Sequence, residues 1–228
     1  GKAVLSQTES TVGDIQLELS VGDYKNEPIS NYSEGSVFTK IGRSVGRLDV
    51  LSDIGISTCT AFIVSDRHII TNHHCTDLAY LAGATRIDAI QFVAGYTITG
   101  RDEGTKKYTV IPTPVEFNEE VGYAVLEVIG NPSAEFGLLN PSSLTPNSGQ
   151  KLLLIGHPWG EAQRVSLKNC RVDTPATVNG MLRHTCFTKP GSSGSALIAA
   201  DTLRVVGLHY SSENNFSHCL NIAKLEDN

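Results

Sequence analysis

The sequence predicts an all-β fold, either a sandwich or a pair of barrels. Short apolar runs recur along the chain between clusters of Gly, Pro, Asn and Asp, which is the pattern of short strands joined by turns. The 228 residues include 21 Gly and 9 Pro and only 18% charged residues, a balance that suits many short strands better than a helical bundle. The length fits one large β domain or two small ones.

The expected strands follow one another after residue 44, and each is a short run rich in Val, Ile, Leu or Tyr. Two segments, 76–84 and 222–227, are expected to form short helices. Residues 1–43 are rich in Ser, Thr, Gly, Glu and Asp, so we interpret them as an N-terminal extension with one strand-like alternation at 15–19. The expected strands are Leu48–Leu51, Ala61–Val64, His68–Thr71, Ile90–Ala94, Tyr108–Ile111, Tyr123–Ile129, Lys151–Ile155, Val165–Leu167, Ala196–Ala199, Leu203–Leu208 and Leu220–Ile222.

The five cysteines divide into two pairs and a remainder. Cys59 and Cys75 have the same spacing as Cys170 and Cys186, which leaves Cys219 over. The simplest interpretation is two local disulfides, each worth about 3 kcal/mol through chain entropy. Disulfides persist in oxidising compartments, so we expect a secreted or periplasmic protein. The alternative is five reduced cysteines in the core, where free Cys is common.

Charge and hydropathy narrow the classes of partner. The formal net charge is −6 and no basic block interrupts the acidic balance, which argues against a nucleic-acid partner. No run approaches the roughly 20 apolar residues that a membrane span requires. We therefore expect a protein that binds neither nucleic acid nor membrane.

A serine flanked by glycines gives the strongest chemical signal. The segment Pro190–Ala196 reads PGSSGSA and precedes an apolar run. Gly191 and Gly194 permit a sharp turn that exposes the Ser193 hydroxyl and leaves backbone N–H groups free to bind a carbonyl oxygen. On its own, the segment is equally consistent with a plain Ser/Gly-rich loop.

A histidine hairpin strengthens the catalytic interpretation. The runs 61–64 and 68–71 form an expected hairpin that ends in His73, His74 and Cys75. A neutral imidazole is the base that a serine hydroxyl needs, and either histidine could serve. The competing interpretation is a zinc site made of His68, His73, His74 and Cys75. Adjacent side chains on a strand point to opposite faces, so His73 and His74 should not converge on one ion. We expect no metal and no other cofactor.

The order of the two motifs on a β-rich chain resembles the chymotrypsin-like (trypsin-fold) serine peptidases, and most of all the bacterial glutamyl endopeptidases. The resemblance covers roughly residues 45–225. It implies two six-stranded antiparallel β-barrels with the active site between them and a short C-terminal helix. It also implies a peptidase domain at 44–228, with barrels at about 44–135 and 136–228, that acts as a monomer on a protein or peptide substrate.

The resemblance assigns roles to individual residues. In that family Thr-Asn-x-His ends a core strand, which matches 71–74 and selects His74 rather than His73 as the general base. Ser193 matches the nucleophile, and the N–H groups of Gly191 and Ser193 match the oxyanion hole. Cys59 and Cys75 match the disulfide that brackets the catalytic histidine.

The sequence departs from the family at the third catalytic residue. Gly122 stands where the family has the aspartate that orients and stabilises the histidine. In peptidases with this triad, an Asp→Asn change lowers kcat by about 10⁴-fold without abolishing catalysis. Gly122 can be an engineered change, which we favour, or a natural loss that leaves a pseudoprotease. Alternatively, Glu119 or Glu120 supplies the carboxylate from the preceding turn.

The same resemblance implies a preference for acidic substrates. Thr188 and His209 match the residues that hold a glutamate side chain in the glutamyl endopeptidases, and a hydroxyl with an imidazole can pair an anion. For His209, the alternative is an ordinary core histidine. Phe187 brings no carboxylate for Lys or Arg. The sequence thus predicts a serine endopeptidase that cleaves after Glu and is attenuated by Gly122; the alternative is a silent pseudoprotease that binds acidic peptides.

Overall fold

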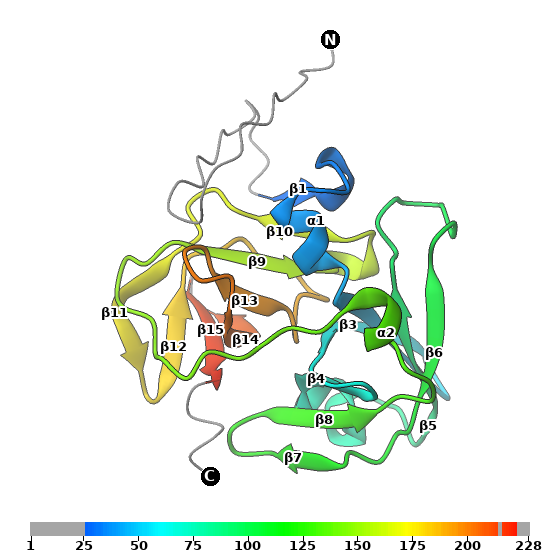
Figure 1. Ribbon diagram of the computed structural model, residues 1–228. Coiled ribbons are helices and arrows are strands. Elements are labelled where there is room, and N and C mark those ends of the chain that lie inside the picture. The colour runs from blue at the N-terminus through cyan, green and yellow to red at the C-terminus, as the bar shows by residue number, and fades with distance from the viewer. Residues whose placement is uncertain (1–25, 214–215, 223–228) are drawn as a thin grey trace.

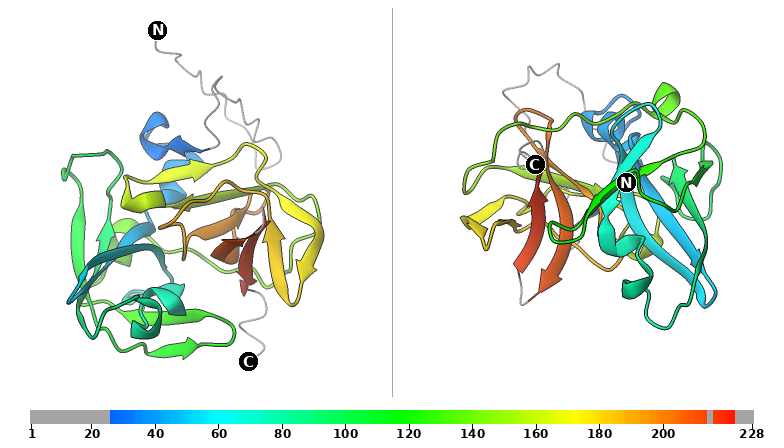
Figure 2. Two further views of the ribbon diagram at one scale, coloured as in Figure 1. Left: turned by 180° about the vertical axis from the view of Figure 1, so that it is seen from behind. Right: turned by 90° about the horizontal axis from the view of Figure 1, so that it is seen from below.

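The computed structural model describes residues 26–213 and 216–222. Two antiparallel sheets of seven and eight strands make up most of this part of the chain (Figures 1 and 2). The all-β prediction is therefore confirmed. Each sheet has more strands than the six expected, because short edge strands that carry no apolar run extend both of them. Residues 223–227 of the expected C-terminal helix and the strand expected at 15–19 lie outside the described residues.

The first sheet follows the chain from residue 45 to residue 127. Its strand order is β6-β5-β2-β3-β4-β8-β7, and every neighbouring pair is antiparallel. Inward-facing apolar side chains such as Leu48, Phe92 and Leu126 form its own core. The strands are β2 (Val45–Ser52), β3 (Gly55–Ile63), β4 (His68–Asn72), β5 (Ile87–Ala94), β6 (Lys106–Val110), β7 (Glu116–Asn118) and β8 (Tyr123–Glu127).

The second sheet uses the remainder of the chain and one strand from before the first sheet. Its order is β1-β10-β9-β13-β14-β15-β12-β11. A core around Leu152, Leu182 and Leu197 lies within it. The strands are β1 (Glu27–Pro28), β9 (Leu152–Gly156), β10 (Arg164–Ser166), β11 (Val172–Val178), β12 (Met181–His184), β13 (Ala196–Ala199), β14 (Val205–Glu213) and β15 (Phe216–Asn221).

A third apolar cluster joins the two sheets. It brings Val45, Phe62 and Ile70 of the first sheet against Ile155 and Leu208 of the second. Burial of such side chains is the main stabilising term in folding, so the sheets pack on each other as a unit. The strands and loops that carry the candidate catalytic residues meet at one side of the interface between the two sheets.

Part of the N-terminal extension packs on the body of the protein. β1 pairs with β10, and the helix α1 (Val37–Gly42) follows the 3-10 turn η1 (Ile29–Asn31). Ile29, Phe38 and Ile41 are buried in the cluster that joins the sheets. Residues 26–43, which the sequence analysis assigned to an N-terminal extension, thus dock on the rest of the protein. None of the helices in the described residues is long and apolar enough to cross a membrane.

Helical structure is scarce in the described chain. The segment expected to be helical at 76–84 holds only the single 3-10 turn η3 (Leu78–Tyr80), just after another, η2 (His73–Cys75). The remaining helical elements are α2 (Ser133–Phe136) and the 3-10 turn η4 (Pro158–Gly160). Four-residue and shorter segments of this kind connect strands and position loops rather than forming a layer.

Candidate active site

A cleft of about 410 Å³ lies where the two sheets meet. Four residues that the sequence singled out, His74, Thr188, Ser193 and His209, line it together. His74 comes from the turn that follows β4. The other three come from the second sheet and its loops. The cleft is lined by His74, Tyr80, Thr188, Lys189, Pro190, Ser193, His209, Tyr210, Ser211 and Ser212.

His74 is held in the cleft by the turn that ends β4. The strand stops at Asn72, and His73, His74 and Cys75 form one 3-10 turn. A disulfide between Cys75 and Cys59 fastens this turn to β3, as the sequence predicted. The second predicted disulfide, Cys170 to Cys186, is also present, and Cys219 is a buried free thiol.

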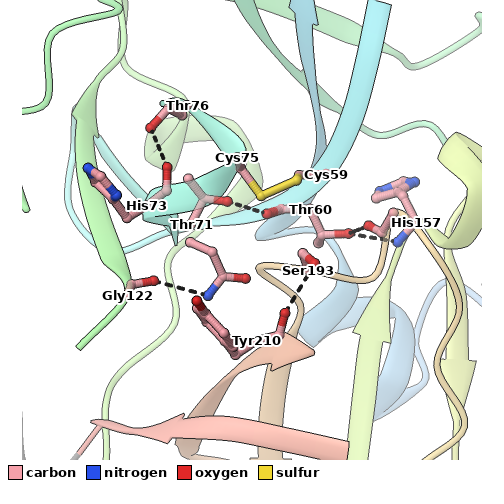
Figure 3. Close-up of a disulfide and its surroundings, with 12 residues drawn as sticks. Cys59, Thr60, Thr71, His73, Cys75, Thr76, Gly122, His157, Ser193 and Tyr210 are labelled. Atoms are coloured by element: carbon pink, nitrogen blue, oxygen red, sulfur yellow. Dashed lines mark hydrogen bonds between the residues drawn. A yellow bond between two sulfur atoms is a disulfide. The ribbon is translucent and has the colours of Figure 1, made fainter. Parts of the chain in front are cut away.

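The two adjacent histidines point to different surroundings. The ring of His73 stacks on Phe117 with centroids 5.1 Å apart, and its Nε2 lies 3.7 Å from a carboxylate oxygen of Asp77. Figure 3 shows His73 turned away from Ser193. His74 lines the cleft, and its role as the general base stays a prediction.

The residues of the alternative zinc site are engaged elsewhere. The sulfur of Cys75 is in the disulfide with Cys59. A hydrogen bond of 2.7 Å joins the Nδ1 of His68 to the hydroxyl of Ser65. The ring of His73 is directed to Asp77. A ring nitrogen of His74 lies within 4.8 Å of the sulfurs of Cys59 and Cys75, but the disulfide occupies both sulfurs.

The serine loop is tied to the first sheet through Thr60 (Figure 3). Its hydroxyl donates to the carbonyl oxygen of Gly191 over 2.9 Å and accepts from the backbone N–H of His157 over 3.0 Å. Gly194 has φ +85°, and a Cβ on it would lie 1.9 Å from the carbonyl oxygen of Thr60. Only glycine allows this close approach of two backbones. The approach holds the adjacent Ser193 against the strand that carries Thr60.

Two backbone donors next to Ser193 have no acceptor within the described residues. The N–H groups of Gly191 and Ser193 donate to no other group there, whereas the neighbouring Ser192, Gly194 and Ser195 donate to backbone carbonyls. Free amides beside a hydroxyl can bind an oxygen on which negative charge develops. The resemblance assigned the oxyanion hole to these two N–H groups, and that role stays a prediction.

The Ser193 hydroxyl donates to the carbonyl oxygen of Tyr210 over 3.3 Å (Figure 3). Within the described residues, the ring of His74 makes no hydrogen bond and has no carboxylate partner. Its contacts there include the rings of Tyr80 and Tyr210, with centroids 6.1 Å and 5.0 Å away. Catalytic hydrogen bonds are often long or unformed before substrate binds, so this geometry is compatible with a resting nucleophile and base.

A family model described as "Trypsin-like peptidase domain" matches residues 59–208, about two thirds of the chain. The chain belongs to this family. The matched stretch includes His74, Gly122 and Ser193. Its two sheets and the cleft between them are thus those of a trypsin-like peptidase domain.

Two curated proteins are similar to this peptidase domain. The secreted RxLR effector protein 73 of Plasmopara viticola is 25% identical over 215 residues, covering 88% of this chain and 52% of that protein. The uncharacterized protein y4fB of Sinorhizobium fredii is 26% identical over 223 residues, covering 89% of this chain and 31% of that protein. The chain thus spans about half the length of the first relative and a third of the second.

Solved proteases share its fold. The active form of the Rv3671c protease of M. tuberculosis has a TM-score of 0.64 at 17% identity, covering 99% of this chain and 92% of that one. An HtrA-type protease, AlgW, solved with a tripeptide, has a TM-score of 0.66 at 18% identity, and the match covers 86% of this chain and 62% of that one. A serine endoprotease from Yersinia pestis has a TM-score of 0.63 at 15% identity, and the match covers 84% of this chain and 65% of that one.

The resemblance seen in the sequence matched Gly122 to the third triad residue, and this glycine offers its backbone carbonyl to the histidine turn. The carbonyl oxygen of Gly122 accepts from the N–H of His73 over 3.0 Å and faces the Nδ2 of Asn72 at 3.4 Å. Glu119 and Glu120 are exposed, and neither hydrogen-bonds His74. The suggestion that one of them supplies the carboxylate is therefore not supported by the geometry.

One end of the peptidase cleft is rich in hydroxyl groups. The hydroxyl of Thr188 is hydrogen-bonded to that of Ser212, and both lie near Ser217, at 3.4 Å and 3.0 Å respectively. His209 is buried behind them and shares a hydrogen bond of 3.1 Å between its Nδ1 and the Nε2 of His184. Ser212, Ser217 and His184 had no signal in the sequence, because serines and a strand histidine are common on surfaces and in cores alike.

Burial keeps the histidines of the site neutral. It lowers the pKa of His209 to about 3, and the nearby His74 and His218 contribute in the same direction. The pKa of His184 is lowered well below its ordinary value, first by burial and then by His209. Burial also lowers the pKa of His74, helped by the adjacent His73. A neutral His74 is the form that can accept a proton.

Proposed function

We propose that this domain is a serine endopeptidase in which Ser193 is the nucleophile and His74 the general base. The observation that carries the proposal is the cleft that both side chains line, together with the N–H groups of Gly191 and Ser193, which have no acceptor within the described residues. A hydroxyl, a neutral imidazole and two free amides are the groups that acyl transfer requires.

The reaction follows from these groups. His74 accepts the Ser193 proton as the serine oxygen bonds to the scissile carbonyl carbon, and the amides of Gly191 and Ser193 bind the resulting oxyanion. The imidazolium then donates its proton to the leaving amine, and an acyl-enzyme remains. A water molecule, deprotonated by His74, then bonds to the acyl carbon. The bond from that carbon to the Ser193 oxygen breaks, the acid leaves, and His74 returns its proton to the serine.

We further propose that the hydroxyl-rich end of the cleft binds a glutamate side chain. A carboxylate there would accept hydrogen bonds from Thr188 and Ser212, and its charge would raise the pKa of the adjacent His209 and favour a charged pair. The Nζ of Lys189, on the same cleft, lies 5.2 Å from the ring centroid of Phe187 and adds a positive charge near the entrance. The exported relative and the two disulfides support work in an oxidising compartment.

The test compares fluorogenic peptides that differ only in the residue before the scissile bond, with Ser193→Ala as the blank. We expect turnover after Glu to exceed turnover after Asp, and turnover after Leu or Arg to stay near the blank. Equal turnover after Leu or Arg would remove the acidic preference. A fluorophosphonate probe, which labels only an activated serine, should label the parent and not the Ser193→Ala variant.

A second function is favoured by one observation, the glycine at position 122. Without a carboxylate on His74, the domain can act as a silent module that binds acidic peptides in the same cleft. The two functions separate cleanly: a folded protein that resists the fluorophosphonate probe but binds a Glu-containing peptide, with weaker binding of its Gln analogue, would be the binding module.

A further inference from the structure

The space beside Gly122 is already filled by Tyr210. Gly122 has φ +98°, a backbone conformation that residues other than glycine rarely adopt. A Cβ built on it would lie 2.6 Å from the Cε2 and 3.1 Å from the Cδ2 of Tyr210. An aspartate at position 122 therefore meets both an unfavourable backbone and an aromatic ring.

Tyr210 also contacts both members of the proposed catalytic pair. Its ring meets that of His74 edge-to-face, with centroids 5.0 Å apart and planes at 89°. Its carbonyl oxygen accepts the hydrogen bond from the Ser193 hydroxyl. The pairing of β14 with β15 shifts register between His209 and Ser211, so Tyr210 sits at an irregularity that turns it toward the cleft.

We propose that Tyr210 is a positioning residue that takes the place of the missing triad acid, and that Gly122 is the matching change that makes room for its ring. The inference rests on the proposed peptidase function. The ring limits the rotation of His74 by packing, as the acid would by hydrogen bonding. Gly122 is then native to this chain rather than a substitution made in it.

The replacement is incomplete in its chemistry. A carboxylate both orients the imidazole and stabilises the imidazolium that forms during attack, whereas a neutral ring edge does only the first. An aspartate restored at position 122 should therefore not increase the rate while Tyr210 is present. The acid becomes useful only when the ring is removed at the same time.

The experiment is a double-mutant cycle of Gly122→Asp and Tyr210→Ser, each with its own Ser193→Ala blank. The serine is small and its hydroxyl can donate to the new carboxylate. Gly130 and Tyr108 supply the matched control: Gly130 has φ +117°, but a Cβ there would lie 3.4 Å from the Cδ1 of Tyr108, an ordinary contact. Gly130→Asp thus measures the cost of an aspartate at positive φ beside a tyrosine that need not move.

We expect Gly122→Asp to lower Tm by at least about 4 °C more than Gly130→Asp does and to leave the rate unchanged or lower. In the double variant, Tyr210→Ser should recover much of that loss and raise turnover at least about tenfold above either single variant. The apparent pKa of the acid limb of kcat/KM should also rise in the double variant, since a nearby carboxylate stabilises the imidazolium.

Tyr210→Phe distinguishes positioning from general packing, because it keeps the ring. Its kcat should stay within about threefold of the parent, while Tyr210→Ser alone should lose at least about tenfold in kcat with little change in KM. Equal losses in Tyr210→Phe and Tyr210→Ser would overturn the positioning role.

The proposed pairing of Gly122 with Tyr210 and the proposed peptidase function predict different failures of this experiment. If Gly122→Asp alone gains several decades in rate without loss of Tm, or if the two substitutions are additive in Tm, the pairing is wrong. If the two substitutions are coupled in Tm but every variant stays at its blank, the pairing stands and the proposed peptidase function falls.

Discussion

The backbone N–H of Thr60 donates a hydrogen bond of 2.8 Å to the carbonyl oxygen of Ser193. This bond crosses from the first sheet to the second, and the Thr60 hydroxyl adds two more contacts to the same region, with Gly191 and His157. The proposed nucleophile is therefore held by the opposite sheet as well as by its own loop. The position of Ser193 thus depends on how closely the two sheets pack.

Replacing Thr60 with Val should disturb the site without changing its shape. Valine keeps the β-branched form but leaves the carbonyl of Gly191 and the N–H of His157 without a partner, which costs about 1–3 kcal/mol for buried groups. We expect a lower free energy of unfolding and slower labelling of Ser193 by a fluorophosphonate. Ser57→Ala, at an exposed position on the same strand, is the control. Unchanged labelling and stability in Thr60→Val would contradict the positioning of the loop by this hydroxyl.

Replacing His184 should weaken discrimination between acidic and neutral substrates. His184 is buried and hydrogen-bonded to His209, so His184→Phe leaves the Nδ1 of His209 unpaired and removes one of the two contacts that orient its ring, the other being the backbone of His218. We expect the ratio of kcat/KM for Glu over Gln peptides to fall by about tenfold. If that ratio is unchanged while the protein stays folded, His184 has no part in recognising the substrate carboxylate.

Stability should fall on acidification in a range set by the buried histidines. Burial lowers the pKa of His157 to about 4, below the ordinary value near 6.5. Between these pH values the unfolded chain binds a proton that the folded chain excludes, so stability is full above about pH 6.5 and is lost as the pH falls toward 4. Urea unfolding across that range should show a loss of about 1.4 kcal/mol per pH unit for this group. His157→Gln should flatten the slope by about one proton, and an unchanged slope would mean that the imidazole is protonated in the folded protein.

The two disulfides offer a matched comparison, because both have a sequence separation of 16 residues. Loss of either bond, as Cys→Ser pairs, should cost a similar amount, about 3 kcal/mol by chain entropy. Only the pair Cys59 and Cys75 brackets His74, so its loss should also reduce labelling of Ser193. Mass spectrometry of the intact protein should count one free thiol, that of Cys219. A count of five would contradict both disulfides.

Much of the fold could be predicted because each central strand carries a short apolar run. The run at 196–199 coincides with β13, and those at 48–51 and 90–94 lie within β2 and β5. The edge strands could not be found in this way. β11 has one buried residue, Val172, and contains a proline, so it depends on pairing with β12 rather than on its own hydrophobicity.

The site was predictable only where the residue type itself carries the chemistry. His74, Thr188, Ser193 and His209 were named from motifs, and the structure brings them to one cleft. Tyr210 could not be found, because its role depends on a shift in strand register and on a glycine 88 positions earlier in the sequence. Such a pair acts through space, and nothing local in the sequence marks it.

The docking of residues 26–43 has a consequence for how the chain folds during synthesis. Asn26 hydrogen-bonds to Arg164, a residue 138 positions later, and β1 pairs with β10 at the same place. A ribosome releases Ile29, Phe38 and Ile41 long before the strands that cover them exist. This segment is made before the strands that cover it and is among the last to pack, so its apolar side chains remain available to chaperones, or to other nascent chains, until the second sheet has formed.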